Sequence, residues 1–501
     1  AFGFVATACS SSSNIEVVVQ GTAVAGTDTT DSPSTVVSNG AYSTAEFATP
    51  TISWDSCGTG LECGYIEVPI NYDDVNSDTT ALYIVKHAAT DAGARIGSLL
   101  VNPGGPGFGG SYLAEAADKI FSQSILSSFD IIGWDPRGTG TSIPAIDCTE
   151  DYDRFFASGD ITPDTDQERA DIVASSEEFT QACFDNNGDL LPYIGTNNVA
   201  RDMDMIRRAL GEDKISYFGF SYGSELGATW TTMFPDTVRA AVLDGASDPN
   251  ADDLVGTLQQ NKGFEESIAT FLANCSADSS CTFHNDGNAE GAFDDLMEQL
   301  DENPISTSSG RPDLTRGMAL TAVAQAMYSD SYWSYLEDAL ASAQAGDGTD
   351  LLSLYDEYFQ RQADGTYGNE LEAFVNILCA DNPDRMTVEE ADALVPQYQA
   401  NAPRFSPGTT GDYTCVFWPK ALDPRIKITG KGAGPIVVIG TTGDAATPLA
   451  STRNMVKALE EGRLIVVTAE QHTGYNVNSC VNEAVDNYLI DLQAPDNELD
   501  C

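Results

Sequence analysis

"KISYFGFSYGSELGATW" (residues 214–230) is a short apolar run that ends at a serine and continues as a helical pattern. Its centre, Gly219-Phe220-Ser221-Tyr222-Gly223, places a glycine two residues to either side of Ser221. Glycine is needed where the backbone turns sharply and neighbouring elements pack too closely for a Cβ atom. A hydroxyl on such a turn points clear of the sheet, and the first N–H groups of the helix point at whatever it attacks. We therefore predict that Ser221 is a nucleophile on a strand–turn–helix elbow.

The same motif also arises by chance in a chain with 44 glycines, so the surrounding pattern has to support it. Eight short runs predict strands, and several are continuously apolar, which is typical of strands covered by helices on both faces. The runs are 63–72, 80–88, 97–105, 129–135, 215–221, 239–247, 434–444 and 462–470. This pattern predicts an α/β protein with a doubly wound, mostly parallel sheet.

Between about 248 and 425 the strand pattern stops and helical periodicity takes over. The helical stretches are 261–275, 292–302, 320–344 and 351–362. A helical insertion between two sheet strands is most simply a cap over the carboxyl edge of the sheet, where open α/β sheets carry their sites. We expect a signal remnant and flexible tether at 1–50, a core at 51–247, a helical cap at 248–425 and the rest of the core at 426–501.

A serine nucleophile requires a base, and the chain contains only three histidines: His87, His284 and His472. His87 lies in an early strand and His284 in the predicted cap. His472 follows the last apolar run, on a loop leaving the sheet edge. The order serine, acid, histidine along the chain leaves only His472 to close a triad. The alternative is an ordinary surface-loop histidine.

The acid of the triad should lie at another strand end between Ser221 and His472. Asp444 ends the run at 434–444, before a predicted helix. Glu470 is the nearest competitor, but it is too close to His472 along the chain. We therefore predict a triad of Ser221, Asp444 and His472.

An oxyanion hole requires two backbone N–H donors, one directly after the serine and one from the loop after the third strand. The first is Tyr222. The second lies in the loop "VNPGGPGFGG" (101–110), where we choose Gly105. A phosphate-binding loop is the alternative, but the lysine of its G-x-x-x-x-G-K-[ST] pattern is missing.

Charge excludes several classes of partner. The chain has 76 acidic and 24 basic residues and a net charge of −52, so its surface repels nucleic acid and anionic membranes. Such acidity is typical of proteins in high salt and also of acidic secreted proteins. No C-x-x-C motif or Cys/His ligand spacing is present, so we expect no metal and no cofactor.

The first residues, "AFGFVATACSSSSN" (1–14), resemble the end of a bacterial signal peptide followed by a lipoprotein processing site. This interpretation puts a lipid on Cys9, although Ala6 is a weaker match than the usual Leu or Val. The Ser/Thr/Gly/Ala-rich stretch up to Pro50 reads as a flexible tether. We expect a bacterial protein that is secreted or held at the cell surface, with a lipid anchor at the outer face of a membrane.

The other ten cysteines agree with export, because disulfides form in oxidising compartments. They occur as five pairs of near neighbours, and short loops favour pairing within each. The predicted disulfides are Cys57–Cys63, Cys148–Cys183, Cys275–Cys281, Cys379–Cys415 and Cys480–Cys501.

Several motifs resemble one family. Pro103-Gly104-Gly105-Pro106-Gly107 resembles the His-Gly-Gly-Pro-Gly loop of proline iminopeptidases, with Pro103 in place of histidine. The secreted tripeptidyl aminopeptidase branch of the α/β-hydrolase fold is similar at 133–142, 219–230, 242–249, 374–383, 440–448 and 472–501. The resemblance covers roughly 50–501 and departs at Ser224-Glu225.

That resemblance implies an α/β-hydrolase fold and an exopeptidase that releases short peptides, tripeptides foremost, from free N-termini. Ser221, Asp444 and His472 match the triad of the family. Since its relatives include esterases, a carboxylesterase or lipase-like hydrolase on the same triad is the alternative. A catalytically silent binding module is a third hypothesis, against which the complete triad argues.

An aminopeptidase must hold a charged amine near the scissile bond, which calls for a carboxylate under the cap. Asp381, beside Cys379, is our first candidate, and Glu225, one turn after the nucleophile, is the second. A solvated or structural acid is the alternative at both positions. We expect Asp135 and Arg137 to brace the loop near the site rather than to take part in the chemistry.

Overall fold

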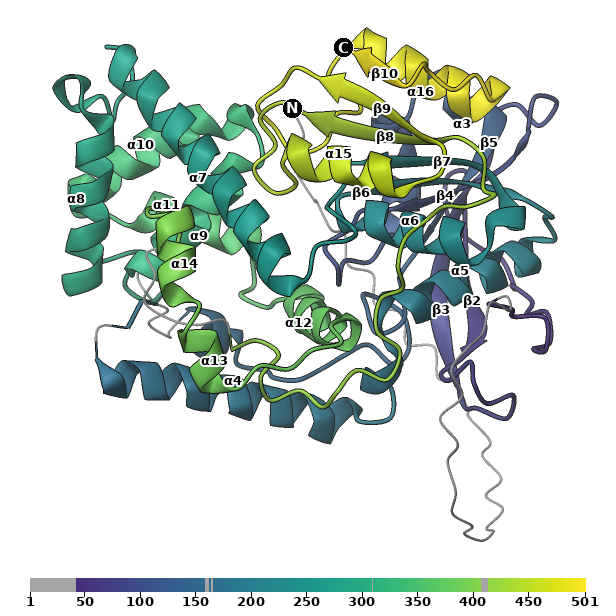
Figure 1. Cartoon of the computed structure of the whole chain (residues 1–501), viewed down its shortest axis with the longest axis horizontal. Helices are drawn as coiled ribbons and strands as arrows, with labels where there is room; N and C mark the ends of the chain where they lie inside the picture. The colour runs from purple at the N-terminus through teal and green to yellow at the C-terminus, as the bar shows by residue number, and fades with distance from the viewer. Residues whose placement is uncertain (1–41, 158–161, 164, 309, 407–412) are drawn as a thin grey trace, which may run out of the picture. The chain divides into compact units, whose positions relative to one another are not determined.

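The computed structural model describes residues 42–157, 162–163, 165–308, 310–406 and 413–501. Cys9 and most of the expected tether lie outside these residues. A ten-stranded sheet runs in the order β1-β2-β3-β5-β4-β6-β7-β8-β9-β10 (Figure 1). The strands are β1 (Asp55–Gly58), β2 (Leu61–Pro69), β3 (Thr79–His87), β4 (Gly97–Asn102), β5 (Phe129–Trp134), β6 (Ile215–Phe220), β7 (Val238–Asp244), β8 (Ile436–Thr441), β9 (Gly462–Val467) and β10 (Glu498–Asp500).

Strands β4 to β10 run parallel, and β1, β2 and β3 form an antiparallel edge. All eight predicted strands are present as β2 to β9. The two short edge strands were not predicted, because β1 is exposed throughout and β10 has only three residues. Neither therefore carries an apolar pattern.

Helices cover both faces of the sheet, as continuous apolar strands require. Side chains alternate: Leu100 packs with one helix layer, while Leu99 and Val101 pack with the other. One layer contains α5 (Thr196–Leu210), α6 (Tyr222–Met233) and α15 (Leu449–Ala458). The other contains α1 (Ser111–Glu115), α2 (Ala117–Ile120), α3 (Gln123–Ser128) and α16 (Ser479–Asp491). The predicted doubly wound α/β class is confirmed.

The chain between β7 and β8 is helical, and its first helices gather beside the sheet (Figure 1). The helices between β7 and β8 are α7 (Asp253–Ala277), α8 (Ala289–Glu302), α9 (Arg316–Met327), α10 (Trp333–Gln344), α11 (Thr349–Tyr358), α12 (Glu370–Asp381), α13 (Val388–Asp392) and α14 (Val395–Asn401). Helices α7 to α11 share an apolar core that also includes Ala445 and Ala446. A methyl group on Gly263 of α7 would lie 2.3 Å from the carbonyl oxygen of Ala445. The inserted helices thus pack directly on the loop that follows β8.

Two features differ from a simple insertion at 248–425. The helical stretch predicted at 320–344 is interrupted between α9 and α10. In addition, α4 (Asp166–Asn187) and its neighbours at 146–194 share an apolar cluster with α12 and Trp418. The helical layer beside the sheet therefore draws on residues from before β6 as well.

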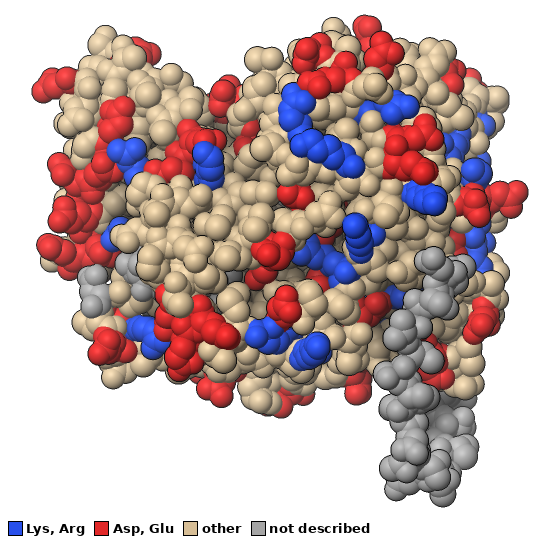
Figure 2. Space-filling model, viewed as in Figure 1, with Lys and Arg blue, Asp and Glu red and all other residues tan. Residues whose placement is uncertain are grey.

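The structure joins the same five cysteine pairs that the sequence analysis expects. Disulfides of this number are typical of an oxidising, extracytoplasmic compartment. None of the described helices is both long and apolar enough to cross a membrane. The face in Figure 2 carries many acidic side chains, in keeping with the net charge of −52.

Candidate active site

Ser221 lies at the sharp turn between β6 and α6. Its φ of 55° and ψ of −127° lie outside the regions that non-glycine residues normally adopt. A methyl group on Gly219 would lie 2.2 Å from the carbonyl oxygen of Gly223, and one on Gly223 would lie 2.8 Å from that of Asn102. The motif glycines are therefore required by close backbone packing, and the strained serine between them has the geometry of a nucleophile elbow.

His472 and Asp444 are hydrogen-bonded to each other. The Nδ1 atom of His472 lies 2.9 Å from both carboxylate oxygens of Asp444. Thr447 donates its backbone N–H to Oδ1 (2.8 Å) and its hydroxyl to Oδ2 (2.9 Å) of the same carboxylate. A proton on Nδ1 that is held by the carboxylate leaves the lone pair of the imidazole on Nε2. Thr447 was not predicted from the sequence, because its role depends on the turn after β8.

Ser221 and His472 both contact the end of β7. The N–H of Ser221 donates to the carbonyl of Asp244 (2.8 Å). A methyl group on the next residue, Gly245, would lie 2.9 Å from Cε1 of His472. The Nε2 atom of His472 is buried and has no hydrogen-bond partner among the described residues. A buried polar atom usually has a partner, so this nitrogen is available to a hydroxyl or a substrate.

Asp244 is a second buried acid near His472, which the sequence analysis did not single out. Its carboxylate accepts the N–H groups of Gly474 (2.7 Å) and Tyr475 (2.8 Å). Burial raises the pKa of Asp244 to about 7, against the opposing effect of these two hydrogen bonds. The carboxylate fixes the loop directly after His472. Its position at a strand end, in "VLDGASDP" (242–249), is the signal that could have found it.

The interruption between α9 and α10 contacts the histidine loop. The N–H of His472 donates to the carbonyl of Tyr328 (2.8 Å), and the N–H of Asp330 donates to the carbonyl of Glu470 (2.9 Å). The rings of Tyr328 and His472 also meet edge to face, with centroids 5.5 Å apart. The inserted helices therefore support the histidine as well as the acid. Glu470, the alternative to Asp444 as the acid of the triad, takes part in this contact through its backbone carbonyl.

Gly104 and Gly105 lie in the loop after β4, next to the serine. A methyl group on Gly104 would lie 2.9 Å from both Cβ of Ser221 and the backbone nitrogen of Tyr222. The N–H of Gly104 already donates to Oδ1 of Asn102 (3.0 Å), so Gly105 supplies the next N–H of the loop. Tyr222 is the first residue of α6, where an N–H has no acceptor within the helix. The structure thus brings the two predicted donor segments together at Ser221.

The two acids predicted to bind a substrate amine both have partners within the protein. Asp381 is 3% exposed, and its oxygens accept the N–H (2.7 Å) and the hydroxyl (2.5 Å) of Thr196. Glu225 is 8% exposed and pairs with Arg425, while its other oxygen faces the hydroxyl of Ser247 at 3.4 Å. Both acids lie beside the start of α6. The side chain of Arg425 is 33% exposed, and its charge also opposes the rise that burial causes in the pKa of Asp381.

Asp135 and Arg137 have structural contacts, in line with the bracing role expected of them. Arg137 is fully buried and binds both oxygens of Asp202, at 2.6 and 2.7 Å. Asp135 accepts the N–H groups of Ser111 (3.0 Å) and Thr141 (2.8 Å). These contacts fix the loop after β5.

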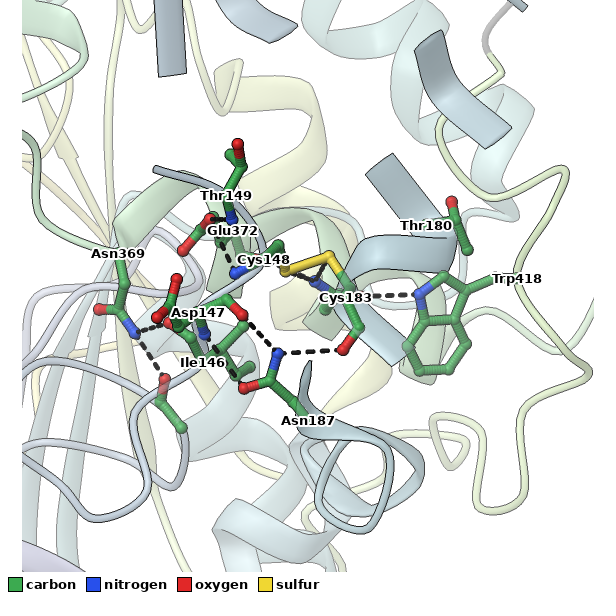
Figure 3. The surroundings of a disulfide bond; sticks show 12 residues. Ile146, Asp147, Cys148, Thr149, Thr180, Cys183, Asn187, Asn369, Glu372 and Trp418 are labelled. Carbon is green, nitrogen blue, oxygen red and sulfur yellow. Dashed lines mark hydrogen bonds between the residues drawn. A yellow bond between two sulfur atoms is a disulfide. The ribbon is translucent and has the colours of Figure 1, made fainter. Parts of the chain in front are cut away.

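Helix α12 is anchored around the Cys148–Cys183 disulfide (Figure 3). Glu372 of α12 accepts the N–H groups of Cys148 (2.9 Å) and the residue after it (2.7 Å). Asn376, one turn further along α12, accepts the indole N–H of Trp418 (2.8 Å) and lies 3.2 Å from the sulfur of Cys183. The position of α12 is therefore fixed from two sides by buried polar contacts.

Comparison with known proteins identifies relatives along most of the chain. A family model described as "TAP-like protein" matches residues 402–501. The serine protease Hip1 of Mycobacterium tuberculosis is 36% identical over 461 residues, which cover 88% of this chain and 87% of Hip1. Carboxylesterase B of the same species is 36% identical over 482 residues, covering 91% of each chain. Tripeptidyl aminopeptidase of Streptomyces lividans is 28% identical over 488 residues, covering 92% of this chain and 88% of the aminopeptidase.

The fold and the relatives together define an α/β hydrolase of the serine-hydrolase class. Within that class, the chain belongs to the TAP-like family of α/β-hydrolase serine peptidases. The resemblance drawn from the motifs is confirmed.

Proposed function

We propose that this protein is a serine exopeptidase that releases short peptides, tripeptides foremost, from free N-termini. The observation that carries the proposal is the Asp444–His472 pair, whose buried Nε2 has no partner among the described residues, together with the strained turn of Ser221, which contacts the same end of β7 as His472. The long match to a tripeptidyl aminopeptidase supports the choice of substrate.

In the first half of the reaction, Oγ of Ser221 attacks the scissile carbonyl carbon and its proton passes to Nε2 of His472. Asp444 orients the ring and stabilises the imidazolium that forms. The N–H groups of Gly105 and Tyr222 bind the negatively charged oxygen of the tetrahedral intermediate. Collapse of the intermediate breaks the C–N bond, and His472 returns the proton to the leaving amine.

The second half repeats these steps with water as the nucleophile. His472 takes a proton from the water, the hydroxide attacks the acyl carbon, and the proton then goes to Oγ of Ser221. The released acid is the short N-terminal peptide.

Selection of a free N-terminus requires a negative charge near the scissile bond to meet the ammonium of the substrate. Of the two expected acids, Asp381 is enclosed with both oxygens bonded to Thr196, whereas Glu225 is held by the side chains of Arg425 and Ser247. Glu225→Gln should therefore lower the preference for free over N-acetylated peptides, whereas Asp381→Asn should slow both substrates together.

The proposal predicts a strong dependence on the free amine. A tripeptide amide such as Ala-Pro-Ala with a chromogenic leaving group should turn over faster than its N-acetylated form. Loss of a charge-assisted, partly desolvated contact costs about 2–3 kcal/mol, or roughly 30- to 150-fold in kcat/KM. Steady-state rates on the matched pair of substrates measure this ratio, and equal rates would rule out the exopeptidase.

A carboxylesterase is the second candidate, because a relative of that name matches 91% of the chain at 36% identity. Simple acyl esters such as p-nitrophenyl butyrate distinguish the two. Fast turnover of esters together with no turnover of any tripeptide amide would establish the esterase instead.

The histidine gives a predicted pH dependence. Burial would lower the pKa of His472, but the charge and hydrogen bond of Asp444 outweigh it, so the pKa is raised above its usual 6.5. The base must be neutral to accept the serine proton, so activity should fall as the pH drops through a value above 6.5. The measurement is kcat/KM against pH on an acyl ester, which carries no titrating amine. An acid limb centred at or below 6.5 would contradict the assignment.

We place the enzyme outside the cytoplasm, secreted or held at the cell surface by a lipid on Cys9, where its substrates would be peptides. The five disulfides support this location.

A further inference from the structure

Three side chains form a hydrogen-bonded chain from α12 to the nucleophile helix. The hydroxyl of Tyr222, at the start of α6, contacts the hydroxyl of Thr196, at the start of α5. The same Thr196 hydroxyl contacts Oδ2 of Asp381 at 2.5 Å, at the end of α12. The ends of α5, α6 and α12 thus meet at Tyr222, the residue after Ser221.

The polarity of this chain follows from hydrogen-bond chemistry. Burial raises the pKa of Asp381 to about 7, and above this value the ionised carboxylate only accepts hydrogen bonds, so the single hydroxyl proton of Thr196 goes to Asp381. The phenol of Tyr222 must then donate its proton to Oγ1 of Thr196. The backbone N–H of Thr196 donates to Oδ1 of Asp381 (2.7 Å) and fixes the second oxygen. Each group therefore has one defined orientation.

The hydrogen-bonded side chains of Thr196 and Asp381 are enclosed by the protein. Thr196 has no exposed surface and Asp381 has 3%. A methyl group on Gly195 would lie 2.7 Å from Oδ1 of Asp381, so the start of α5 is shaped to receive this carboxylate. The carbonyl of Asp381 also accepts the N–H of Arg425 (3.1 Å). A side chain so enclosed is poorly placed to meet a substrate amine.

The first turn of α12, at the opposite end from Asp381, contacts the loop that contains Gly105. A methyl group on Gly107 would lie 2.3 Å from the carbonyl oxygen of Glu370 and 2.7 Å from the nitrogen of Phe374. The loop that contains Gly105 therefore lies against the first turn of α12. Helix α12, anchored as Figure 3 shows, therefore packs on the loop of Gly105 at one end and reaches Tyr222 through Thr196 at the other.

We propose that Asp381 and Thr196 are positioning residues for the oxyanion hole: through the phenol of Tyr222 they fix the direction of its backbone N–H. This inference rests on the proposed serine mechanism and gives Asp381 a different role from the amine binding expected from the sequence. Because the N–H acts on the transition state, its misalignment should lower kcat rather than raise KM.

Thr196→Val and Tyr222→Phe each remove one hydroxyl and keep the backbone donors. Removing a whole oxyanion donor costs about 10²–10³ in kcat, so tilting one should cost about tenfold. Both variants should lose about tenfold in kcat with KM unchanged, and the double variant should lose no more than either one. Thr196→Ser keeps the hydroxyl and should restore the wild-type rate.

Binding of two probes separates positioning from packing. Ala-Pro-boroAla forms a tetrahedral adduct with the serine, and its affinity should fall by the same factor as kcat. The product tripeptide Ala-Pro-Ala should bind unchanged. Thr231→Val is the matched control: this buried hydroxyl on α6 donates only to the helix carbonyl of Ala228, and its loss should leave kcat unchanged.

Wild-type kcat in both single variants would overturn the inference. Weaker product binding at unchanged kcat would assign Asp381 and Thr196 to substrate binding instead. A Thr196→Ser variant as slow as Thr196→Val would show that the loss of rate comes from altered packing and not from the missing hydroxyl. Failure of the proposed serine mechanism itself looks different, because wild-type enzyme would then bind neither the boronate nor a serine-directed phosphonate. An esterase on the same triad would react with the phosphonate but would not turn over the tripeptide amide.

Discussion

Replacing Ser221 with alanine is expected to lower kcat/KM by roughly 10⁴- to 10⁶-fold while the protein remains folded. The hydroxyl is the only group that this change removes. Every backbone contact of the turn remains, including the hydrogen bond from the N–H of residue 221 to the carbonyl of Asp244. Residual turnover would come from the oxyanion donors and substrate binding alone. Steady-state kinetics on the tripeptide amide measure the loss, and thermal unfolding shows whether the fold is intact.

Ser221→Gly is a companion variant that separates chemistry from strain. The serine holds a φ of 55° and a ψ of −127°, a conformation that costs a non-glycine residue about 1–3 kcal/mol. Glycine relieves that cost but loses backbone entropy, so a net gain of about 1 kcal/mol in the free energy of unfolding is expected. Both variants should be inactive, and only the glycine variant should be more stable than wild type. An alanine variant with more than a tenth of wild-type activity would contradict the assignment of the nucleophile.

Replacing Asp444 with asparagine is expected to lower kcat by about 10⁴-fold, with KM little changed. Asparagine keeps the size of the side chain, but its amide donates where the carboxylate accepts. It therefore favours the imidazole tautomer with the proton on Nε2, which cannot take the proton of Ser221. The hydrogen bonds from Thr447 constrain which way the new amide turns.

Glu470→Gln is the matched control for this choice of acid. The side chain of Glu470 lies beside Gly443, and its contact with Asp330 uses the backbone, so activity should stay near that of wild type. A large loss of activity in Glu470→Gln together with a mild loss in Asp444→Asn would make Glu470, and not Asp444, the acid of the triad.

The sequence was informative wherever function depends on local order. The eight apolar runs became β2 to β9, and Ser221, Asp444 and His472 each follow the end of one of these strands. A sheet built from parallel strands brings such positions to one edge, so the rule of chain order was enough to select them.

Contacts between distant segments could not be predicted in this way. Thr196 meets Asp381 across 185 residues, and no periodicity indicates that pairing. The interruption between α9 and α10 was not visible in the continuous helical pattern. It is accompanied by the hydrogen bond from His472 to Tyr328, a contact between distant segments that leaves no periodicity in the sequence. Asp381 and Glu225 were selected for their charge, but whether a buried acid is already paired is decided by the tertiary structure.

The most direct test of the account is covalent labelling of the whole protein with a fluorophosphonate, followed by mass spectrometry of its peptides. We expect one adduct per chain, on Ser221, no adduct in Ser221→Ala, and much slower labelling in Asp444→Asn. An adduct on any other residue, or labelling that persists in Ser221→Ala, would contradict it.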